Sequence, residues 1–408
     1  MMITLQQNLW YGGEPCQLEL PDDWDVEVLE MPCDIEPVLT RQQIVDKINS
    51  PYGMMPLSEM AKGKKKVGIA IDDISRGTPT KVLAPIVLDI LAEAGIKKEQ
   101  IIFICATGSH AAHNRKQFSD KLGEEIVGSY RIYNHNCYEN CTNIGKAKEG
   151  FDVLVNSEFM SCDLKIGFGG LLPHGMSGFS GGYRMLIPGL CHLDTIEQIH
   201  RQVYSYDTAG KLSGNAKHDA MHRMISDIGK MAGDFYKIDC IYNTKQEVVD
   251  VFAGDAWEEY CAGAKRAEVL YGVKKPEPAN LIIANANAKP SYATMGLFLG
   301  MGLIHEDGGD MVLVNFSKEG QSIHYLRGDF GEFAPSRIPS GPKPDKRPYG
   351  KTIYFSPYAD YNAISNLHVQ PDSFVWADSW PKVLSHIQAR KGPIRAIVMT
   401  DASMMHLD

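Results

Sequence analysis

The feature that most constrains the fold of this chain is an alternation of buried strands and amphipathic helices that begins at Lys65. Residues 65–72 (KKVGIAID) read as a buried strand, residues 80–94 follow the spacing of an amphipathic helix closed by Gly95, and residues 101–108 (IIFICATG) read as the next strand. Alternating strands and helices are typical of parallel sheets with helices on both faces. The pattern therefore predicts an α/β fold.

The same alternation restarts later in the chain, which predicts two domains. A length of 408 residues is also too great for one ordinary core. The proline-rich, charged stretch 272–278 is the best candidate for a linker. We predict an N-terminal domain of residues 1–274 and a C-terminal domain of residues 275–408, each with a mostly parallel sheet flanked by helices.

The other predicted elements follow from local pattern. In the first domain they are a hairpin of residues 2–11 and 16–21 with a turn at 12–15, a helix near 44–48, strands at 151–155 and 162–170, a long helical region at 195–231, a hairpin at 237–255 and a helix at 257–271. In the second they are strands at 279–288, 310–316, 351–357 and 395–401 and a helix at 292–302.

Charge and the N-terminal sequence limit the partners and the compartment. The formal net charge is −9, which argues against nucleic acid as the main partner, and the basic run at residues 62–66 is expected to be a solvated lead-in to a strand. The N-terminus lacks the features of a signal peptide, and no stretch approaches the roughly 20 apolar residues of a membrane span. We therefore expect a cytoplasmic protein without a membrane partner, whose oligomeric state the sequence does not predict.

The nine cysteines are scattered and odd in number, which does not suggest a disulfide framework. Cys137 and Cys141 form a CxxxC pair, but only His135 lies near them as a further zinc ligand. Buried free thiols are the better interpretation.

Three polar segments follow predicted strands and are expected to meet at one edge of the first sheet. They are residues 72–79 (DDISRGTP), residues 106–110 (ATGSH) and residues 169–174 (GGLLPH). In parallel sheets, ligands bind beyond the carboxyl ends of the strands. These segments are therefore the first place to look for a functional site.

Two histidines in these segments are candidates for acid–base chemistry. His110 and His174 each follow a strand, and two imidazoles at one sheet edge favour an acid–base pair over two structural histidines. Asp73 and Arg76 lie three residues apart at a strand-to-helix junction. They are either a helix cap with a surface arginine, or an aspartate that orients a histidine and an arginine that clamps a carboxylate.

A glycine-rich loop follows the third segment. Residues 178–182 (GFSGG) allow close approach of the backbone to a ligand, and Arg184 just beyond them favours an anion site. A tight turn without a ligand is an equal alternative, because the loop matches neither a P-loop nor a GxGxxG fingerprint. His200 lies in the predicted helical region, too far in sequence from other cysteines or histidines for a local metal motif, and taken by itself it indicates a structural role.

Taken together, these segments resemble the nickel-pincer nucleotide enzymes of the lactate racemase family. DDISRGTP resembles the family's D-I-(S/T)-R-x-T-P motif, ATGSH its A-x-G-T-H segment, and PHGMSGFSGGYRMLIPG its H-x-x-x-G-F-S-G-G-x-K-x-x-x-P-G segment. His200 falls at the spacing of the family's nickel ligand. The resemblance covers most of the first 270 residues, and DGGDMVLVNFSKEGQSIHY resembles the second domain more loosely.

The resemblance implies two α/β domains with the active site in the cleft between them, and a racemase or epimerase that inverts C2 of a 2-hydroxy acid by hydride transfer to and from a nickel-pincer nucleotide. By this resemblance His200 is the nickel ligand and His110 and His174 are the paired bases. Asp73 and Arg76 support the bases and the substrate. The cofactor-binding residues would be Ser177, Phe179, Ser180, Gly181, Gly182 and Arg184.

Two departures from the family pattern bear on cofactor and substrate. Arg184 stands where the family has a lysine bonded covalently to the cofactor, so we expect the nucleotide to be held non-covalently. The family's Tyr-Gln-x-x-Lys segment is absent, and Asn285, Asn287 and Lys289 lie just upstream, with Tyr292 after them. We expect Asn287, Lys289, Tyr292 and Arg76 to bind a hydroxy acid longer than lactate, such as a sugar acid; the alternative is that the amides only cap the turn after the strand.

Two other functions remain open at this stage. A nicotinamide-dependent hydroxyacid dehydrogenase would be expected to carry a GxGxxG fingerprint after its first strand, which this chain lacks. A non-catalytic protein that binds a nucleotide or sugar acid is favoured mainly by Arg184 in place of lysine.

Overall fold

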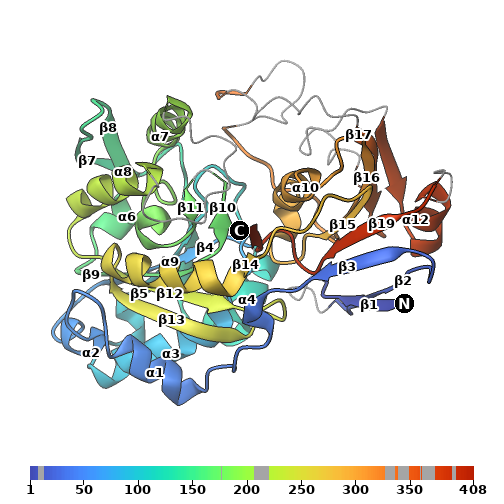
Figure 1. The fold of residues 1–408 in the computed structure, drawn as a ribbon. Helices are drawn as coiled ribbons and strands as arrows, with labels where there is room; N and C mark the ends of the chain where they lie inside the picture. Colours follow the sequence, from blue (N-terminus) through green and yellow to red (C-terminus); the bar gives the residue numbers. More distant parts are fainter. Residues whose placement is uncertain are drawn as a thin grey trace. The chain divides into compact units, whose positions relative to one another are not determined.

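The structure, a computed structural model, divides into two compact units (Figure 1). The larger unit comprises Glu36–Val269 and Ile323–Gly341, and the smaller unit comprises Met1–Ile35, Leu270–Ser322 and Pro342–Asp408. The residues that the structure describes are 1–7, 13–175, 177–205, 220–326, 336–338, 349–358, 360, 373–387 and 392–408.

A six-stranded sheet forms the centre of the larger unit, in the order β13-β12-β9-β4-β5-β6. All neighbouring strands are parallel except β13, which forms the predicted hairpin with β12. The strands are β4 (Val67–Asp72), β5 (Ile101–Ala106), β6 (Arg131–Asn134), β9 (Leu164–Gly170), β12 (Tyr236–Tyr242) and β13 (Val248–Asp255). Every residue of β5 is buried, as expected for a strand covered on both faces.

Helix α3 (Thr80–Glu93) packs on this sheet through an apolar stripe. In α3, Leu83, Val87 and Leu91 recur at four-residue spacing and are fully buried. Helix α4 (Arg115–Leu122) begins at a capping box in which Asn114 and Gln117 bond reciprocally. The other helices are α1 (Arg41–Ile48), α2 (Leu57–Met60), α5 (Glu124–Ser129), α6 (Ser157–Met160), α7 (Leu193–Ser205), α8 (Ala220–Gly229) and α9 (Glu258–Tyr271). Figure 1 shows α1, α2 and α3 together on one side of the sheet.

The smaller unit contains a second six-stranded sheet, β18-β17-β16-β15-β19-β3, and all its pairings are parallel. Its strands are β3 (Asp25–Leu29), β15 (Leu281–Asn285), β16 (Gly309–Val314), β17 (Tyr349–Phe355), β18 (Phe374–Ala377) and β19 (Arg395–Met399). Helices α10 (Thr294–Met301) and α12 (Trp380–Ile387), the β1–β2 hairpin (Met2–Leu5 with Cys16–Glu19) and a short β14–β20 pair (Gly272–Val273 with His406–Leu407) complete it. The predicted α/β class with two mostly parallel sheets is confirmed.

The structure differs from the expected division at residues 274 and 275 in two places. The first 35 residues belong to the smaller unit, because β3 pairs along β19 and Arg395 bonds to Asp25 and Glu27. Conversely, Ile323–Gly341 belongs to the larger unit. Local pattern could not reveal either exchange, since both depend on pairing between segments far apart in the chain.

Other differences are local. The expected strand near 151–155 forms as β8 (Asp152–Asn156), but it pairs antiparallel with β7 (Cys141–Lys146) instead of joining the main sheet. The expected turn at 12–15 and the middle of the helical region at 195–231 fall partly outside the described residues. Among the described residues, no helix is both long enough and apolar enough to cross a bilayer.

Candidate functional site

Three loops follow β4, β5 and β9, which are neighbours in the larger sheet, and so they meet at one edge. Backbone contacts tie them together. The amide of Gly108 donates to the carbonyl of Gly189 at 2.9 Å, and the amide of Gly189 donates to the carbonyl of Arg184 at 3.2 Å. A Cβ on Gly170, at the end of β9, would lie 3.0 Å from the hydroxyl of Thr78 in the loop after β4. The edge of the sheet thus brings together the segments predicted from sequence.

Asp73 and His110 form the first functional pair. Nδ1 of His110 lies 2.5 Å from Oδ2 of Asp73, and the amide and hydroxyl of Ser75 both donate to Oδ1 of the same carboxylate. Burial by itself would raise the pKa of Asp73, but His110 and Arg76 together hold it well below its usual range. The carboxylate therefore stays ionised and holds the Nδ1 proton of His110, which leaves Nε2 of His110 as the basic nitrogen.

Arg76 lies in the same loop, half-buried. Its guanidinium donates to the hydroxyl of Ser75 at 2.9 Å and to the carbonyl of Ser75 at 3.3 Å. Its charge also lowers the pKa of Asp73. The arginine is thus part of the carboxylate–imidazole group and is not the isolated surface arginine of the capping alternative.

The sequence did not reveal what holds this loop in place. Lys121 of α4, 1% exposed, forms an ion pair with Asp72 and donates to the carbonyl of Arg76 at 2.9 Å. His113 accepts the amide hydrogen of Ile74 at 2.7 Å through Nε2, and burial lowers the pKa of His113, which favours this neutral, accepting form. No signal in the sequence separates Lys121 from Lys116, the exposed lysine of the same helix, because only the tertiary packing buries Lys121.

His174 and Arg184 form the second pair, joined by Ser177. His174 lies in β10 (Pro173–His174), which pairs with β11 (Gly178–Phe179). Nη2 of Arg184 lies 3.1 Å from Nε2 of His174, and Nη1 of Arg184 donates to the hydroxyl of Ser177, which is itself 3.1 Å from Nδ1 of His174. A guanidinium can only donate, so Nε2 of His174 is the acceptor and is unprotonated here.

The glycine-rich loop is built by packing within the protein. A Cβ on Gly181 (φ 108°) would lie 2.6 Å from Leu171, and one on Gly182 (φ 56°) would lie 2.7 Å from the carbonyl of Ala256. Ser180 donates its hydroxyl to the carbonyl of Gly170 at 2.5 Å. These contacts explain the glycines without a ligand, in agreement with the tight-turn alternative. Phe179 is fully buried in β11.

Buried charges lie beneath this loop. The amide of Gly182 donates to Oδ2 of Asp239 at 2.6 Å, and Asp239 forms an ion pair with Lys237; both side chains are fully buried. Burial raises the pKa of neighbouring Glu259 well above its usual range, so this carboxyl is neutral. Burial also lowers the pKa of His222, whose ring stacks on Tyr260 with centroids 3.6 Å apart. The sequence did not single out any of these residues.

His200 lies in α7 and is buried. Its Nδ1 lies 2.7 Å from the carbonyl of Ile196, one turn earlier in the helix. A carbonyl only accepts, so Nδ1 carries the proton. This is the arrangement in which a histidine binds a metal, since the second ring nitrogen of a ligating histidine usually donates to a carbonyl or carboxylate. The ring of His200 is therefore oriented as a metal-binding histidine would be.

Apart from Arg76, the candidate substrate residues lie in the smaller unit, as does Asn285. Asn285, at the end of β15, accepts from Gln7 at 2.7 Å and donates to the carbonyls of Gln6 and Thr400, so it holds neighbouring loops together. Asn287 and Lys289 are buried, and Tyr292 is half-buried in the turn before α10.

Lys289 is 2% exposed and lies close to Asp401; burial raises the pKa of Asp401 to about 6, and the charge of Lys289 opposes part of that rise. For Asn285 the structure supports the capping alternative.

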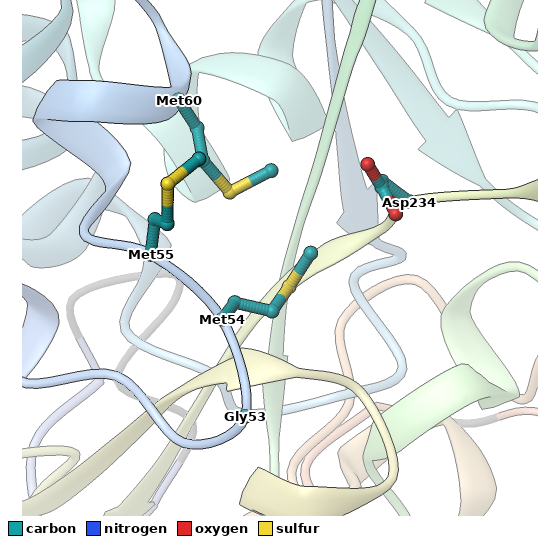
Figure 2. Close-up of a pocket in the computed structure, with 5 residues that line it drawn as sticks. All are labelled: Gly53, Met54, Met55, Met60 and Asp234. Carbon is teal, nitrogen blue, oxygen red and sulfur yellow. The ribbon is translucent and has the colours of Figure 1, made fainter.

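A hollow of about 560 Å³ on the larger unit is separate from these groups (Figure 2). It is lined by Gly53, Met54, Met55, Met60 and Asp234. Asp234 precedes β12, which runs parallel to β9, so this hollow lies toward the amino ends of the strands. The histidine loops lie at the opposite, carboxyl ends.

Known proteins resemble this chain in sequence. Residues 11–211 match the family model described as the lactate racemase N-terminal domain. The chain is 24% identical over 284 residues to the lactate racemase of Thermoanaerobacterium thermosaccharolyticum and 25% identical over 289 residues to that of Lactiplantibacillus plantarum. Each alignment covers 69% of this chain, and 66% and 68% of the two relatives, so the chain spans about two thirds of their length.

Solved structures share the fold. The lactate racemase apoprotein of T. thermosaccharolyticum superposes with a TM-score of 0.75 at 18% identity, covering 100% of both chains. A protein from Thermotoga maritima superposes with a TM-score of 0.66 at 16% identity, covering 92% of this chain and 100% of its own. The match of 11–211 spans His110, His174, Arg184 and His200, and it agrees with the resemblance seen in the motifs.

Proposed function

Because this chain belongs to the lactate racemase family, we propose that it is an isomerase that inverts C2 of a 2-hydroxy acid with His110 and His174 as its acid–base pair. One observation carries the proposal: each imidazole is held by its own partner at the same sheet edge. Asp73 holds Nδ1 of His110, and Ser177 with Arg184 holds the ring of His174. Two bases are needed because the hydroxyl of the substrate points in different directions in the two enantiomers.

The proton transfers follow from the ring orientations. Nε2 of His110 takes the hydroxyl proton as C2 becomes planar, and the ionised Asp73 stabilises the imidazolium that forms. For this direction of reaction His174 must carry a proton on Nε2 once Arg184 has released it; when the planar intermediate reorients, His174 gives that proton to the oxygen, which leaves His110 protonated and His174 neutral, and the reverse reaction exchanges the two roles. Arg76 pairs with the substrate carboxylate throughout, since a guanidinium matches its two oxygens.

A nickel-pincer nucleotide would complete this site, with Nε2 of His200 as the protein ligand to nickel. When bound, it supplies an acceptor and donor for the C2 hydrogen and its electron pair, which no side chain provides. Direct removal of a C2 proton next to an ionised carboxylate would meet a large barrier. The fit is best at His200; the amide of Gly182 is already bonded to Asp239, so that amide is not part of a phosphate cradle.

Arg184 implies non-covalent binding of this nucleotide. An arginine cannot readily form the thioamide link that the family's lysine forms, whereas its guanidinium is well suited to pair with a phosphate or carboxyl-derived group. Its present partners, Ser177 and His174, would be released when it does so. Release of His174 would free Nε2 to act on the substrate.

The substrate is proposed to be longer than lactate, such as a sugar acid. Asn287, Lys289 and Tyr292 would bind its additional hydroxyls or its carboxylate. Support comes from the absence of the family's Tyr-Gln-x-x-Lys segment and from the burial of Lys289 beside Asp401. Turnover that increases from lactate to aldonates would support this extension, and strict preference for lactate would refute it.

The test of the cofactor is mass spectrometry after co-expression with a cofactor-making pathway. Wild type should carry a nickel-containing mass under native conditions and lose it on denaturation, whereas Arg184→Lys should retain a covalent adduct. An adduct on denatured wild type would contradict non-covalent binding. A bare chain that still binds a sugar acid without turnover would favour a binding protein.

The test of the chemistry is inversion of the hydroxy acid in D₂O. Transfer of the C2 hydrogen as hydride leaves that hydrogen unexchanged, so the product should contain no deuterium at C2. Incorporation of deuterium at C2 would indicate proton abstraction instead. Net formation of NADH from the hydroxy acid would indicate a dehydrogenase, and loss of inversion in His110→Ala should accompany the expected result.

A further inference from the structure

One short segment belongs to the larger unit although the chain on both sides of it belongs to the smaller unit. It comprises Ile323–Leu326 and Ser336–Ile338, and we call these described residues the strap. The chain before it, Leu270–Ser322, and the chain after it, from Pro342, belong to the smaller unit. Such a return orders the backbone at an entropic cost, so the contacts it makes in the larger unit must offset that cost.

One end of the strap lies against the loop that carries His110. The amide of Tyr325 donates to the carbonyl of Ser109 at 2.8 Å, and His324 forms an isolated antiparallel bridge with His110. The rings of His110 and His324 meet edge to face, with centroids 5.1 Å apart and planes at 67°. The hydroxyl of Ser109 lies 3.3 Å from Nδ1 and 3.4 Å from Nε2 of His324.

The other end is anchored on α7, the helix of His200. The guanidinium of Arg337 lies 3.1 Å from Asp194 and 3.4 Å from Glu197, and Arg201 donates to the carbonyl of Arg337 at 2.9 Å. The amide of Arg337 donates to the carbonyl of Leu326, which closes the strap on itself. Leu326 and Ile338 are buried in the core of the larger unit.

We propose that His324 is a positioning residue for His110, kept in place by the strap; this rests on the proposed role of His110 as a base. The bond to Asp73 fixes Nδ1 of the His110 ring, and any tilt of the ring about that bond moves Nε2. Contact with a second ring restricts that tilt. The amide of Leu326 donates to Nδ1 of His324 at 3.3 Å, so the second ring is itself held. Preorganisation of this kind fixes the direction of Nε2.

The test compares two readouts in His324 variants. The first is the rate at which diethyl pyrocarbonate modifies His110, followed by peptide mass spectrometry on protein without cofactor. The second is kcat and KM of the loaded enzyme. The side chain of His110 is 14% exposed in wild type. His324→Ala should raise the modification rate several-fold and lower kcat by about tenfold, with less change in KM, because a small misplacement of a reacting group is costly.

Two further variants separate positioning from other roles. His324→Phe keeps a ring beside His110 but no ring nitrogens, and it should restore both readouts to within about threefold of wild type if ring contact is what matters. The side chain of Arg337 is half-exposed and lies at the other end of the strap. Arg337→Ala should therefore loosen the strap without unfolding the protein. It should change both readouts in the same direction by a smaller factor. His305→Gln, on an exposed histidine of the smaller unit, is the control and should change neither.

The outcomes are distinguishable. An unchanged modification rate in His324→Ala would overturn the proposal, even if kcat falls, since His324 would then act on the substrate directly. A faster modification with an unchanged kcat would also overturn it. If wild type inverts no hydroxy acid, the proposed function fails, while the modification rates still report whether His324 holds the ring of His110.

Discussion

In both sheets, buried polar side chains lie at the carboxyl ends of the parallel strands, yet their hydrogen-bond partners differ. In the larger unit, Asp73 and Ser177 bond to the imidazoles of His110 and His174, side chains suited to acid–base chemistry. In the smaller unit, Asn285 and Asp401 bond mainly to backbone groups of neighbouring loops. A polar residue after a strand therefore does not by itself indicate chemistry. Its partner decides whether it positions a reactive group or fixes the fold.

The largest effect expected from this comparison is on activity, from Asp73→Asn. The amide keeps the shape of the side chain but loses the charge that fixes the tautomer of His110, so kcat should fall by about a thousandfold or more. The measurement is the rate of inversion by the loaded enzyme, with circular dichroism to verify the fold. An activity within tenfold of wild type would remove the distinction between the two sheet edges.

The next effect is on stability, from Lys121→Met. Removal of one partner from a buried ion pair typically costs about 3–5 kcal/mol. Among the described residues, Lys121 is the only cation that forms an ion pair with Asp72. Urea unfolding should show this loss in the free energy of unfolding. Lys116→Met on the same helix is the matched control: its ion pair with Asp120 is exposed, so the change should stay below about 1 kcal/mol. Equal effects in both variants would contradict the role assigned to Lys121.

Asn285→Ala tests the smaller sheet edge. It removes three hydrogen bonds and leaves buried carbonyls with fewer donors, which should cost about 2–3 kcal/mol in the free energy of unfolding. Activity per folded molecule should remain close to that of wild type, because Asn285 bonds to the fold and not to a reactive group. A selective loss of kcat with unchanged stability would assign it to the substrate after all.

The smallest effect concerns pH. Burial raises the pKa of Asp401 from 3.8 to about 6. A carboxyl whose pKa is higher in the folded state holds its proton there while the unfolded chain has lost it, so its contribution to stability falls as pH rises between about 4 and 6. The free energies of unfolding of wild type and Asp401→Asn should be measured at pH 4.5 and at pH 6.5. Between these pH values, wild type should lose about 1–3 kcal/mol relative to the variant. A constant difference across that range would show that Asp401 ionises normally.

The sequence correctly predicted that the segments after β4, β5 and β9 meet at one edge of the sheet, for a physical reason. Buried parallel strands such as 101–106 have an uninterrupted apolar pattern, and the carboxyl ends of neighbouring parallel strands must meet. His110 and His174 could therefore be placed at one sheet edge before the fold was known. Their resemblance to a known family added the roles proposed for Arg184 and His200, which pattern alone did not supply.

What the sequence determined by itself is the α/β class, the buried strands such as β4, β5, β9 and β15, and the loops that hold Asp73, His110 and His174. Only the tertiary structure decided that β3 joins the second sheet, that Lys121 is buried under the Asp72 loop, and that His324 lies against His110. The physical reason is the range of the interactions. Periodicity and capping act over a few residues, whereas strand pairing, burial of a charge and contact between rings depend on segments up to several hundred residues apart.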